Sequence, residues 1–349
     1  MNLKIENTNI EFFNSFNLAI KFDSVASAFS FDFYYNPENP QHKALFKPGT
    51  YRRCIVEHNG QLLITGTLIS DSASTAAAKE LNGMGGYSLP GVLEDCNIPV
   101  SLYPLQSDGL SLRQIAQKLI KPFSLTMVVD SAVASLMDQV FTTSTADTSQ
   151  SIKSYLCELA SQKNINVTHN PQGHLLFTKA KTGGVPILDI DMSGESGSVQ
   201  STICTSMKRS LNGQAMHSSI TVIKQADSSG GNAGQSSINN PYATVFRPMV
   251  KVQSSGTDNS TAAAARNALS DELKNLKFTL ELNTWEIDGQ LIMPNNLITV
   301  KNPELAIDKK TTLFIESITY TGNEKIDTCT LTCVVPEVYN TATPKNIFL

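Results

Sequence analysis

The chain has 349 residues, of which 41% are hydrophobic and 17% are charged. At roughly 150 residues per domain, this length predicts two or three domains. The charged fraction lies below the usual ~25%, which favours β-rich structure with uncharged polar faces. The 27 basic and 31 acidic side chains leave a net charge of −4. This balance argues against a surface that grips nucleic acid in a sequence-specific way or binds an anionic membrane.

The amino terminus and the cysteines indicate the compartment. The first residues, MNLKIENTNIEFFNSF, lack the basic start and apolar run of a signal peptide, and no long apolar stretch follows. We therefore expect synthesis in the cytosol and no membrane insertion. The six cysteines, at positions 54, 96, 157, 204, 329 and 333, are too few and too scattered for a secreted disulfide framework. Reduced, mostly buried thiols are expected.

Residues 1–99 read as a first β-domain. Short runs of alternating apolar and polar residues are broken by Gly, Pro and Asn, which is typical of an antiparallel sheet or barrel. Residues 54–57 and 62–69 form the clearest pair of strands. The Asn59-Gly60 turn between them tolerates the positive φ of a tight hairpin, so we predict a hairpin here.

Residues 100–195 read as a small α+β domain. Ser111 and Gln114 form a capping box that begins a helix, and Pro122 ends it. A second helix is expected after Thr148 or Ser149, because five apolar residues then recur at helical spacing: Ile152, Tyr155, Leu156, Leu159 and Ala160. Strands over 164–168 and 174–178 are expected to follow, joined by the Asn170-Pro-Gln-Gly173 turn.

Residues 196–349 read as a second β-domain. It contains a polar segment near 226–240, which we expect to be a mobile loop that orders against a neighbouring subunit. A helix is expected near 260–276, with five residues on its buried side: Ala262, Ala265, Leu269, Leu273 and Leu276. Residues 62–67 and 313–318 share an apolar-to-small pattern after a turn. This echo raises the possibility that the two β-domains arose by duplication.

No pattern of catalytic or phosphate-binding residues stands out. The five histidines (42, 58, 169, 174 and 217) show no HExxH or paired ligand spacing, and we read them as structural or surface residues. Cys329 and Cys333 would lie about 13 Å apart along a strand, too far to bind one zinc ion together. The glycines at 83, 85 and 86 do not match GxGxxG, and no GxxxxGK[ST] occurs.

Three acidic or serine-containing segments resemble functional sites only in part. Asp189-Ile-Asp191-Met-Ser193-Gly194 matches the first half of a calcium loop, but Gln200 replaces the bidentate Glu, and we read a strand end and turn. Residues 194–198 are out of phase with GxSxG. Glu94 and Asp95 would point to opposite faces of a strand and could not act together. The sequence therefore predicts no catalytic, cofactor-binding or metal-binding residue and no cofactor. We favour a structural role for the protein.

The blocks at 86–97 and 285–300, with the segments at 313–320 and 328–336, resemble motifs of a known family, the Mu-like phage tail proteins that form the baseplate hub of contractile tails. The block GYSLPGVLEDCN at 86–97 is similar to the family's Gly-x-Ser-Arg-Thr-x-Asp-Leu-x-Asp-Cys-Ser, although Leu89 and Pro90 replace Arg and Thr. The stretch WEIDGQLIMPNNLITV at 285–300 resembles the family's carboxy-terminal run, with Ile292 in place of Trp. The segments LFIESITY at 313–320 and TCTLTCVVP at 328–336 continue that run.

This resemblance implies an α+β, β-dominated fold with two tail-tube-like β-barrel domains and an inserted small α+β domain. It implies a homotrimer that presents a pseudo-sixfold ring, joins the hexameric tail tube to the trimeric central spike, and encloses the DNA channel. Three chains would carry a net charge of −12, compatible with a lumen in which DNA slides. The expected partners are other copies of the chain, the central spike, the tail tube or distal tube protein, the baseplate wedge proteins and, as a further candidate, the tape-measure protein. The expected location is the virion tail baseplate, assembled in the host cytoplasm.

Three other readings stay open. The chain could be the hub of a non-phage contractile injection system or tailocin, which sequence alone does not distinguish from a phage hub. A tail-associated cell-wall hydrolase is an alternative of another class, against which stand the missing spaced carboxylates and zinc ligands. A soluble β-rich ligand-binding module would be a monomer with a pocket, so the quaternary state would separate it from a hub.

Overall fold

The computed structural model describes residues 1–6, 8–10, 13–75, 81–194, 202–224, 234–253, 260–323, 327–340 and 342–349. The chain divides into two compact units. Unit 1 contains Met1–Lys179, Thr284–Ile292 and Ser317–Cys329. Unit 2 contains Ala180–Asn283, Met293–Glu316 and Thr330–Leu349. The two long carboxy-terminal strands, β20 (Ile307–Asn323) and β21 (Asp327–Val334), are divided between the units.

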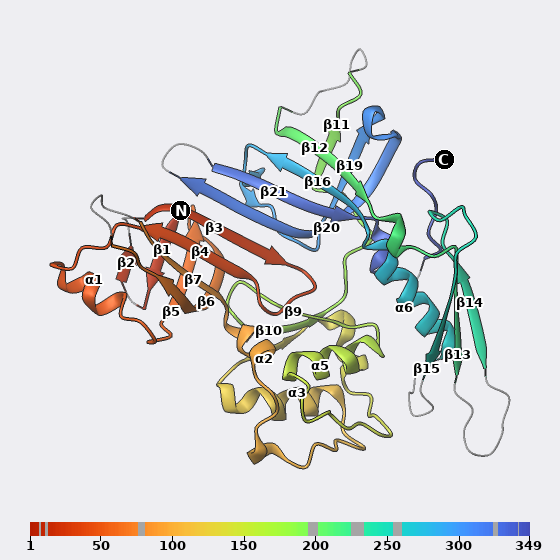
Figure 1. Ribbon diagram of the computed structural model, residues 1–349, viewed down its shortest axis with the longest axis horizontal. Coiled ribbons are helices and arrows are strands. Elements are labelled where there is room, and N and C mark those ends of the chain that lie inside the picture. Colours follow the sequence, from red (N-terminus) through yellow and green to blue (C-terminus); the bar gives the residue numbers. More distant parts are fainter. Residues whose placement is uncertain are drawn as a thin grey trace. The chain divides into compact units, whose positions relative to one another are not determined.

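Unit 1 is built on an antiparallel sheet, seen in red and orange in Figure 1. Its strands run in the order β3-β4-β7-β6-β5-β1-β2, and the part of β20 that belongs to this unit pairs with β3. The bounds are β1 (Asn2–Ile5), β2 (Thr8–Ile10), β3 (Phe13–Lys21), β4 (Ala28–Phe33), β5 (Arg53–His58), β6 (Gln61–Ser72) and β7 (Asn82–Ser88), with the helix α1 (Pro40–Leu45) between β4 and β5. The predicted hairpin is confirmed: Asn59 and Gly60 join β5 and β6 with φ of 47° and 78°.

Two glycines let the strands of this sheet lie close under an aromatic ring. A Cβ on Gly66 would lie 2.2 Å from the Tyr87 carbonyl oxygen, and one on Gly86 would lie 2.1 Å from the Thr67 carbonyl oxygen. The Phe29 ring fills the remaining space, with atoms 2.6 Å from both Cβ positions. Any larger residue here would force the backbone apart, which explains glycine inside two strands.

The second part of unit 1 is a helical layer on a small sheet. Figure 1 shows α3 (Leu112–Ile120) and α5 (Ile152–Ser161) beside the sheet β8-β10-β9, and their apolar faces share one core. The capping box of Ser111 and Gln114 is confirmed. The second helix is capped by Ser151, slightly later than predicted, and its five predicted apolar residues are all buried. The other elements are η1 (Leu89–Gly91), α2 (Val92–Asp95), η2 (Val100–Leu102), η3 (Lys121–Phe123), β8 (Met127–Val129), η4 (Ser131–Val133), α4 (Ala134–Met137), β9 (Asn166–His169) and β10 (Leu175–Thr178).

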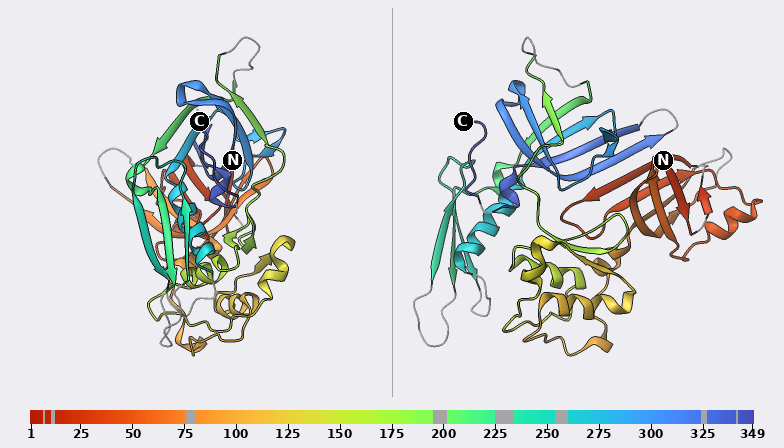
Figure 2. Two further views of the ribbon diagram at one scale, coloured as in Figure 1. Left: turned by 90° about the vertical axis from the view of Figure 1, so that its right-hand side faces the viewer. Right: turned by 180° about the vertical axis from the view of Figure 1, so that it is seen from behind.

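Unit 2 contains strands of the large sheet and a separate, small three-stranded sheet. β12 pairs with β16, and β11 pairs in parallel with β19, which pairs with β20. The small sheet has the order β14-β13-β15, and α6 runs along it in all three views of Figures 1 and 2. The bounds are β11 (Leu188–Asp191), β12 (Cys204–Leu211), η5 (Gly213–Ala215), β13 (Ser219–Lys224), β14 (Gln235–Asn239), β15 (Pro248–Gln253), α6 (Thr261–Leu273), β16 (Leu276–Leu282), β19 (Leu297–Asn302), η6 (Pro303–Leu305) and η7 (Pro336–Val338).

Two expectations for this unit differ from the structure. The segment near 226–240, predicted to be a loop, ends in the strand β14, because its backbone pairs with β13 and Ile238 lies opposite Ile220. Residues 225–233 of that segment lie outside the described residues. The predicted helix near 260–276 ends at Leu273, and Leu276 begins β16. Ala262 is exposed, and Ala268 is buried instead.

The fold class predicted from the sequence is confirmed. The protein is α+β and dominated by β-strands, with a curled half-barrel sheet and an inserted α+β part. Residues 62–67 and 313–318, which share a sequence pattern, both lie in strands, β6 and β20. In the part of the chain that the structure describes, no helix is both long and apolar enough to span a membrane.

Candidate interaction surface

Among the described residues, the most exposed run of large apolar side chains lies in and before the edge strand β15. Val245 and Phe246 are 62% and 90% exposed, and Val250 and Val252 are 61% and 70% exposed. β15 pairs with β13 on one side and ends the three-strand order of this sheet. We call these four residues the apolar strip. A run of this kind marks a contact surface more often than an isolated apolar residue does.

The strand register explains why the valines of the strip face outward. Val250 and Val252 lie opposite Thr221 and Ile223 of β13, whereas the alternate residues Ile220 and Val222 are buried. Side chains alternate between the faces of a strand, so the buried residues define the face that α6 covers. The two valines therefore lie on the uncovered face.

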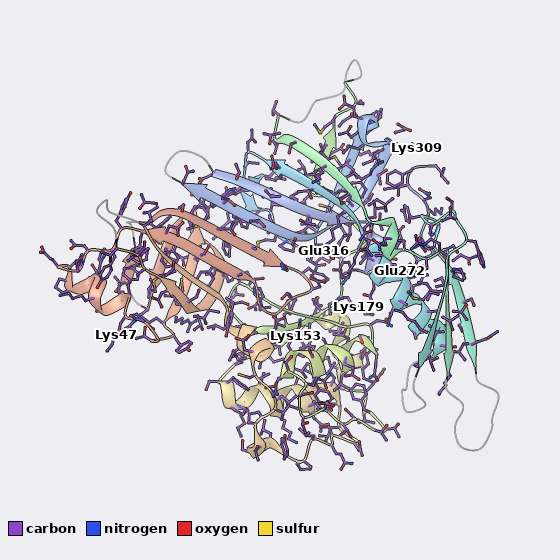
Figure 3. All side chains as sticks on the ribbon, viewed as in Figure 1. Lys47, Lys153, Lys179, Glu272, Lys309 and Glu316 are labelled. Atoms are coloured by element: carbon purple, nitrogen blue, oxygen red, sulfur yellow. The ribbon has the colours of Figure 1, made fainter. Side chains whose placement is uncertain are left out.

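A buried carboxylate holds the small sheet to α6. Glu272, near the end of α6, is 7% exposed (Figure 3). It accepts the backbone N–H of His217 at 2.8 Å, pairs with the His217 ring at 2.6 Å and accepts the Asn240 amide at 3.3 Å. His217 precedes β13 and Asn240 follows β14, so one side chain connects the helix to two strands. This fixes the sheet that presents the apolar strip.

In unit 1, the sequence motif at 285–300 begins in a tightly packed aromatic cluster. Trp285 is 3% exposed, and its ring centroid lies 5.3 Å from that of Phe16, 4.6 Å from that of His58 and 5.1 Å from that of Tyr320. Its Nε1–H donates to the Thr328 carbonyl at 2.9 Å. Trp285, the first residue of this motif, thus packs into the core of unit 1, although most of that unit (Met1–Lys179) comes much earlier in the sequence.

The hairpin that follows Trp285 contacts the predicted β5–β6 turn. The hairpin consists of β17 (Glu286–Ile287) and β18 (Gln290–Leu291). The Asn59 amide donates to Glu286 at 2.9 Å, and the Gln61 amide donates to the Gly289 carbonyl at 3.0 Å. Burial beside Trp285 lowers the pKa of His58, so this ring is mainly neutral at pH 7.

The structure gives the two aspartates of the partial calcium motif different hydrogen-bond partners. Asp189 accepts the Thr299 hydroxyl at 2.6 Å and pairs with Lys310, whose ammonium lowers the pKa of this carboxyl. Asp191 instead accepts the Ser193 N–H at 2.9 Å, as in a strand end and turn. Ser196 and Gln200 lie outside the described residues.

Glu94 and Asp95 lie in the helix α2, a single turn over Val92–Asp95 that buries Leu93, and not in a strand. Glu94 pairs with Lys153 of α5 at 3.0 Å, and Asp95 accepts the Tyr87 hydroxyl at 2.7 Å (Figure 3). Each carboxylate thus holds a different element of unit 1.

The six cysteines are free thiols, and four of them are buried: Cys54, Cys204, Cys329 and Cys333. The prediction of reduced, mostly buried cysteines is thereby confirmed. Burial raises the pKa of Cys157 to about 11 and that of Cys329 to about 12, so these thiols stay protonated at neutral pH. The described residues contain no group of three or more His, Cys, Asp or Glu side chains that could hold a metal ion.

Comparison with known proteins shows which proteins this chain resembles. Residues 90–179, the part that contains α3 and α5, match the family model described as the second domain of the gp44-like baseplate hub proteins. This part of the chain therefore resembles a baseplate hub domain, and the resemblance found in the sequence motifs is confirmed.

Particular relatives extend the match along the chain. The sequence is 26% identical over 288 residues to the baseplate hub protein gp44 of Escherichia phage Mu, covering 78% of this chain and 72% of that protein. The 43 kDa tail protein of prophage MuSo2 from Shewanella oneidensis has a similar structure, with a TM-score of 0.81 at 18% identity over 97% of this chain and 99% of that chain.

A more distant match is the E. coli c3393 protein, described as a component of the type VI secretion system with structural similarity to the T4 phage tail proteins gp27 and gp5. Its TM-score is 0.55 at 9% identity, covering 95% of this chain and 76% of that chain. The two structural matches show a shared fold.

Proposed function

We propose that this chain is the structural hub of a contractile phage-tail baseplate, and that it works as a homotrimer. In this proposal the trimer forms a pseudo-sixfold ring that joins the hexameric tail tube to the trimeric central spike and encloses the DNA channel. The observation that carries the proposal is the gp44-like second domain within a chain that resembles Mu-like tail proteins over most of its length. The protein acts by holding other proteins together, without catalysing a reaction.

The proposed organisation follows from the sequence. Residues 1–99 and 196–349 would form two tube-like β-domains, and residues 100–195 the inserted α+β domain. Two similar domains in each of three chains would give the ring six similar positions, which a hexameric tube can match. The net charge of −4 per chain supports a channel wall that does not hold DNA tightly.

The proposed partners are the spike on one side of the ring and the tube or distal tube protein on the other, with wedge proteins around it and the tape-measure protein as a further candidate. The spike contact is supported by the likeness to c3393, which is itself described as similar to phage tail proteins gp27 and gp5. The proposed location is the tail of the virion, after assembly in the host cytoplasm.

We assign the apolar strip to the contact between copies of the chain. Val250 and Val252 lie on the uncovered face of the edge strand β15, and edge strands with apolar side chains readily pair with another chain. Fully burying four large apolar side chains would contribute on the order of 5–10 kcal/mol before the entropy of association is subtracted.

The test is the solution mass of the purified protein, with class averages from negative-stain images. A trimer has about 114 kDa, three times 37.9 kDa, and a ring with a central hole. The Val250→Lys/Val252→Lys variant should lose the trimer, because it buries two ammonium groups without partners. Val185→Lys is the control, since Val185 is 92% exposed and lies outside the strip.

Two results would overturn these assignments. A wild-type protein that stays monomeric both alone and with a trimeric spike protein contradicts the hub. A Val250→Lys/Val252→Lys variant that still forms the ring contradicts the role of the strip but leaves the hub intact.

The hub of a non-phage contractile injection system is the second candidate. The likeness to a type VI secretion component favours it, and the adaptor task is the same. The genes beside the coding sequence distinguish the two, since a phage hub lies among capsid and packaging genes.

A further inference from the structure

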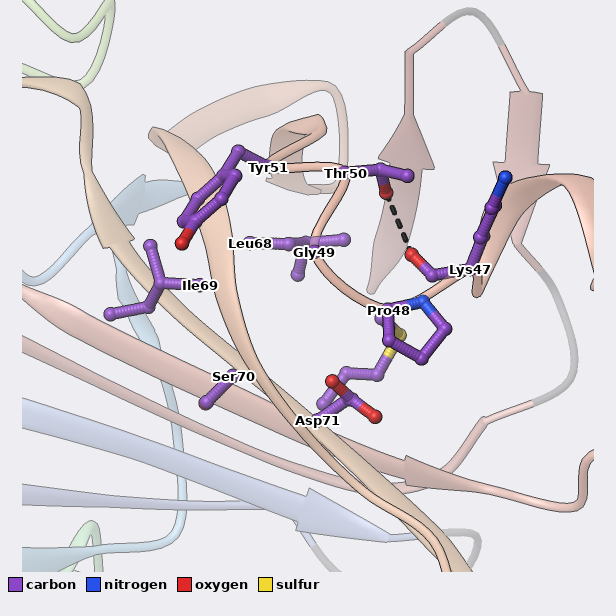
Figure 4. A pocket seen from close by; sticks show the side chains of 10 residues that line it. Lys47, Pro48, Gly49, Thr50, Tyr51, Leu68, Ile69, Ser70 and Asp71 are labelled. Carbon is purple, nitrogen blue, oxygen red and sulfur yellow. Dashed lines mark hydrogen bonds between the residues drawn. The ribbon is translucent and has the colours of Figure 1, made fainter.

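Unit 1 contains an open pocket at one end of its β-sheet, next to α1. It has a volume of about 210 Å³ and lies between the ends of β4, β6 and β7 and the segment after α1. A second, shallow hollow along the loop 47–51, drawn in Figure 4, shares Pro48, Asp71 and Met84 with it. All of these residues belong to unit 1.

One wall of the pocket is aromatic. Phe33 and Phe46 stack with their centroids 4.1 Å apart and an interplanar angle of 30°, and Tyr35 also lines the space. His42 fixes this wall from behind: it is 5% exposed and its ring lies 5.5 Å from Phe46 and 6.0 Å from Tyr35. The wall is therefore closely packed, and aromatic side chains attract cations to their ring faces.

The lining of the pocket also includes a carboxylate. Asp71 of β6 lies opposite Met84 of β7 in the sheet register, and both line the pocket. In the described part of the chain, no basic side chain lies within 4 Å of the Asp71 carboxylate. Lys47 borders the neighbouring hollow, but its ammonium points away from Asp71 in Figure 4.

Size and charge together define what the pocket can hold. A volume of about 210 Å³ equals that of roughly seven water molecules at ~30 Å³ each. This is below the ~300 Å³ of a typical small-molecule site but enough for one long side chain. Aromatic rings, Met84 and Pro48 suit an aliphatic stem, and Asp71 suits a cation at its tip.

We propose that this pocket binds an arginine or lysine side chain presented by a partner protein. The aliphatic stem lies against Phe33, Phe46 and Met84, and the cationic group meets Asp71 beside the aromatic wall. Exposed apolar side chains near the strand ends offer further contact area for the segment that carries the cation: Tyr34, Tyr51, Ile69 and Leu81 are 41–67% exposed. The pocket thus specifies a basic anchor residue, and this goes beyond the proposed hub function, which does not depend on it.

The test follows the methyl signal of Met84 by NMR in the full-length protein labelled with ¹³C-methyl methionine. The chain has nine methionines, and Met84→Leu identifies the signal by its loss. N-acetyl-arginine methylamide is the probe, and N-acetyl-norleucine methylamide is its uncharged counterpart of similar length. We expect a saturable shift of Met84 with the arginine amide, and at most a third of that shift with the norleucine amide at the same concentration.

Three variants make the test specific. Asp71→Asn should weaken binding of the arginine amide about threefold to fivefold, as expected for one partly exposed charge pair. Asp308→Asn, which changes an exposed aspartate of β20, should leave it unchanged. Ala73→Trp should abolish the shift, because Ala73 is exposed and lines the pocket, so the indole can fill it without disturbing the core.

Each outcome decides the proposal. Equal shifts from the arginine and norleucine amides would show an apolar site without preference for a cation, and would overturn it. So would an arginine-induced shift that Asp71→Asn does not weaken, or the absence of any shift at the solubility limit of the amide. Because every variant is compared by its other methionine signals, a misfolded variant is recognised and replaced by Asp71→Ser.

Discussion

Replacing Trp285 should strongly destabilise unit 1. The indole is almost fully buried among Phe16, His58 and Tyr320, and its N–H satisfies the Thr328 carbonyl. Truncating a buried aromatic residue to alanine costs about 3–5 kcal/mol. The unpaired carbonyl adds about 1 kcal/mol or more. We expect Trp285→Ala to lower the free energy of unfolding by about 4–6 kcal/mol.

The matched variant Trp285→Phe separates packing from hydrogen bonding. It keeps an aromatic ring but loses the N–H donor, so we expect a loss of about 1–2 kcal/mol. For a unit of roughly 200 residues, each kcal/mol shifts the melting temperature by about 2–4 °C. Trp285→Ala should therefore lower it by about 8–24 °C, and Trp285→Phe by about 2–8 °C.

The assay is thermal unfolding followed by far-ultraviolet circular dichroism. The wild type can also be followed by fluorescence, because Trp285 is the chain's only tryptophan, and burial predicts blue-shifted emission that moves red on unfolding. A shift of less than 2 °C for Trp285→Ala would refute the reasoning, since the ring would then contribute little to the core. Equal shifts for the two variants would show that the hydrogen bond, not packing, dominates.

Three further predictions concern other parts of the chain. Glu272→Ala should destabilise the small sheet by about 2–4 kcal/mol, because the His217 N–H loses a charged acceptor. Amide hydrogen exchange should then become faster in β13 and β14 and stay unchanged in β5 and β6. An equal increase in all four strands would contradict this prediction. Burial lowers the pKa of His169 below 6.5, so protonation favours the unfolded chain and stability should fall as the pH drops below about 6.5, the unfolded value. His169→Phe should flatten that fall in denaturant titrations from pH 7 to 5, and an unchanged slope would exclude His169 as its source. Gly66→Ala should cost about 2 kcal/mol or more because its Cβ would meet a backbone oxygen at 2.2 Å, whereas Gly213→Ala, with nothing within 4 Å, should be nearly neutral in the same titration.

Much of the local structure could be predicted from the sequence because its causes are local. The Asn59-Gly60 turn adopts the positive φ values that this pair tolerates best. Ser111 and Gln114 cap α3 through side chains only three residues apart. The helical spacing of the apolar residues in α5 already defined its buried face. Turns, caps and periodicity depend on neighbouring residues, so these features can be predicted from the sequence alone.

Exposure within strands could not be predicted in the same way. The alternation of Val250, Lys251 and Val252 favours buried valines and an outward lysine, yet both valines are exposed. Strand pattern defines two faces but does not say which one another element covers. In this case the packing of α6 against Ile220 and Val222 decided it, and the apolar strip was therefore missed.

The sequence by itself determined the fold class, the capped helices, the first hairpin and the resemblance to the hub family, because each rests on short motifs or on neighbouring residues. Only the tertiary structure brought Trp285 against His58, more than two hundred positions away, and placed Asp71 in one pocket with Phe33 and Phe46. Contacts between such distant segments form because burying apolar surface offsets the entropy of closing long loops. That balance depends on the whole folded chain, so a local sequence pattern does not predict which distant segments meet.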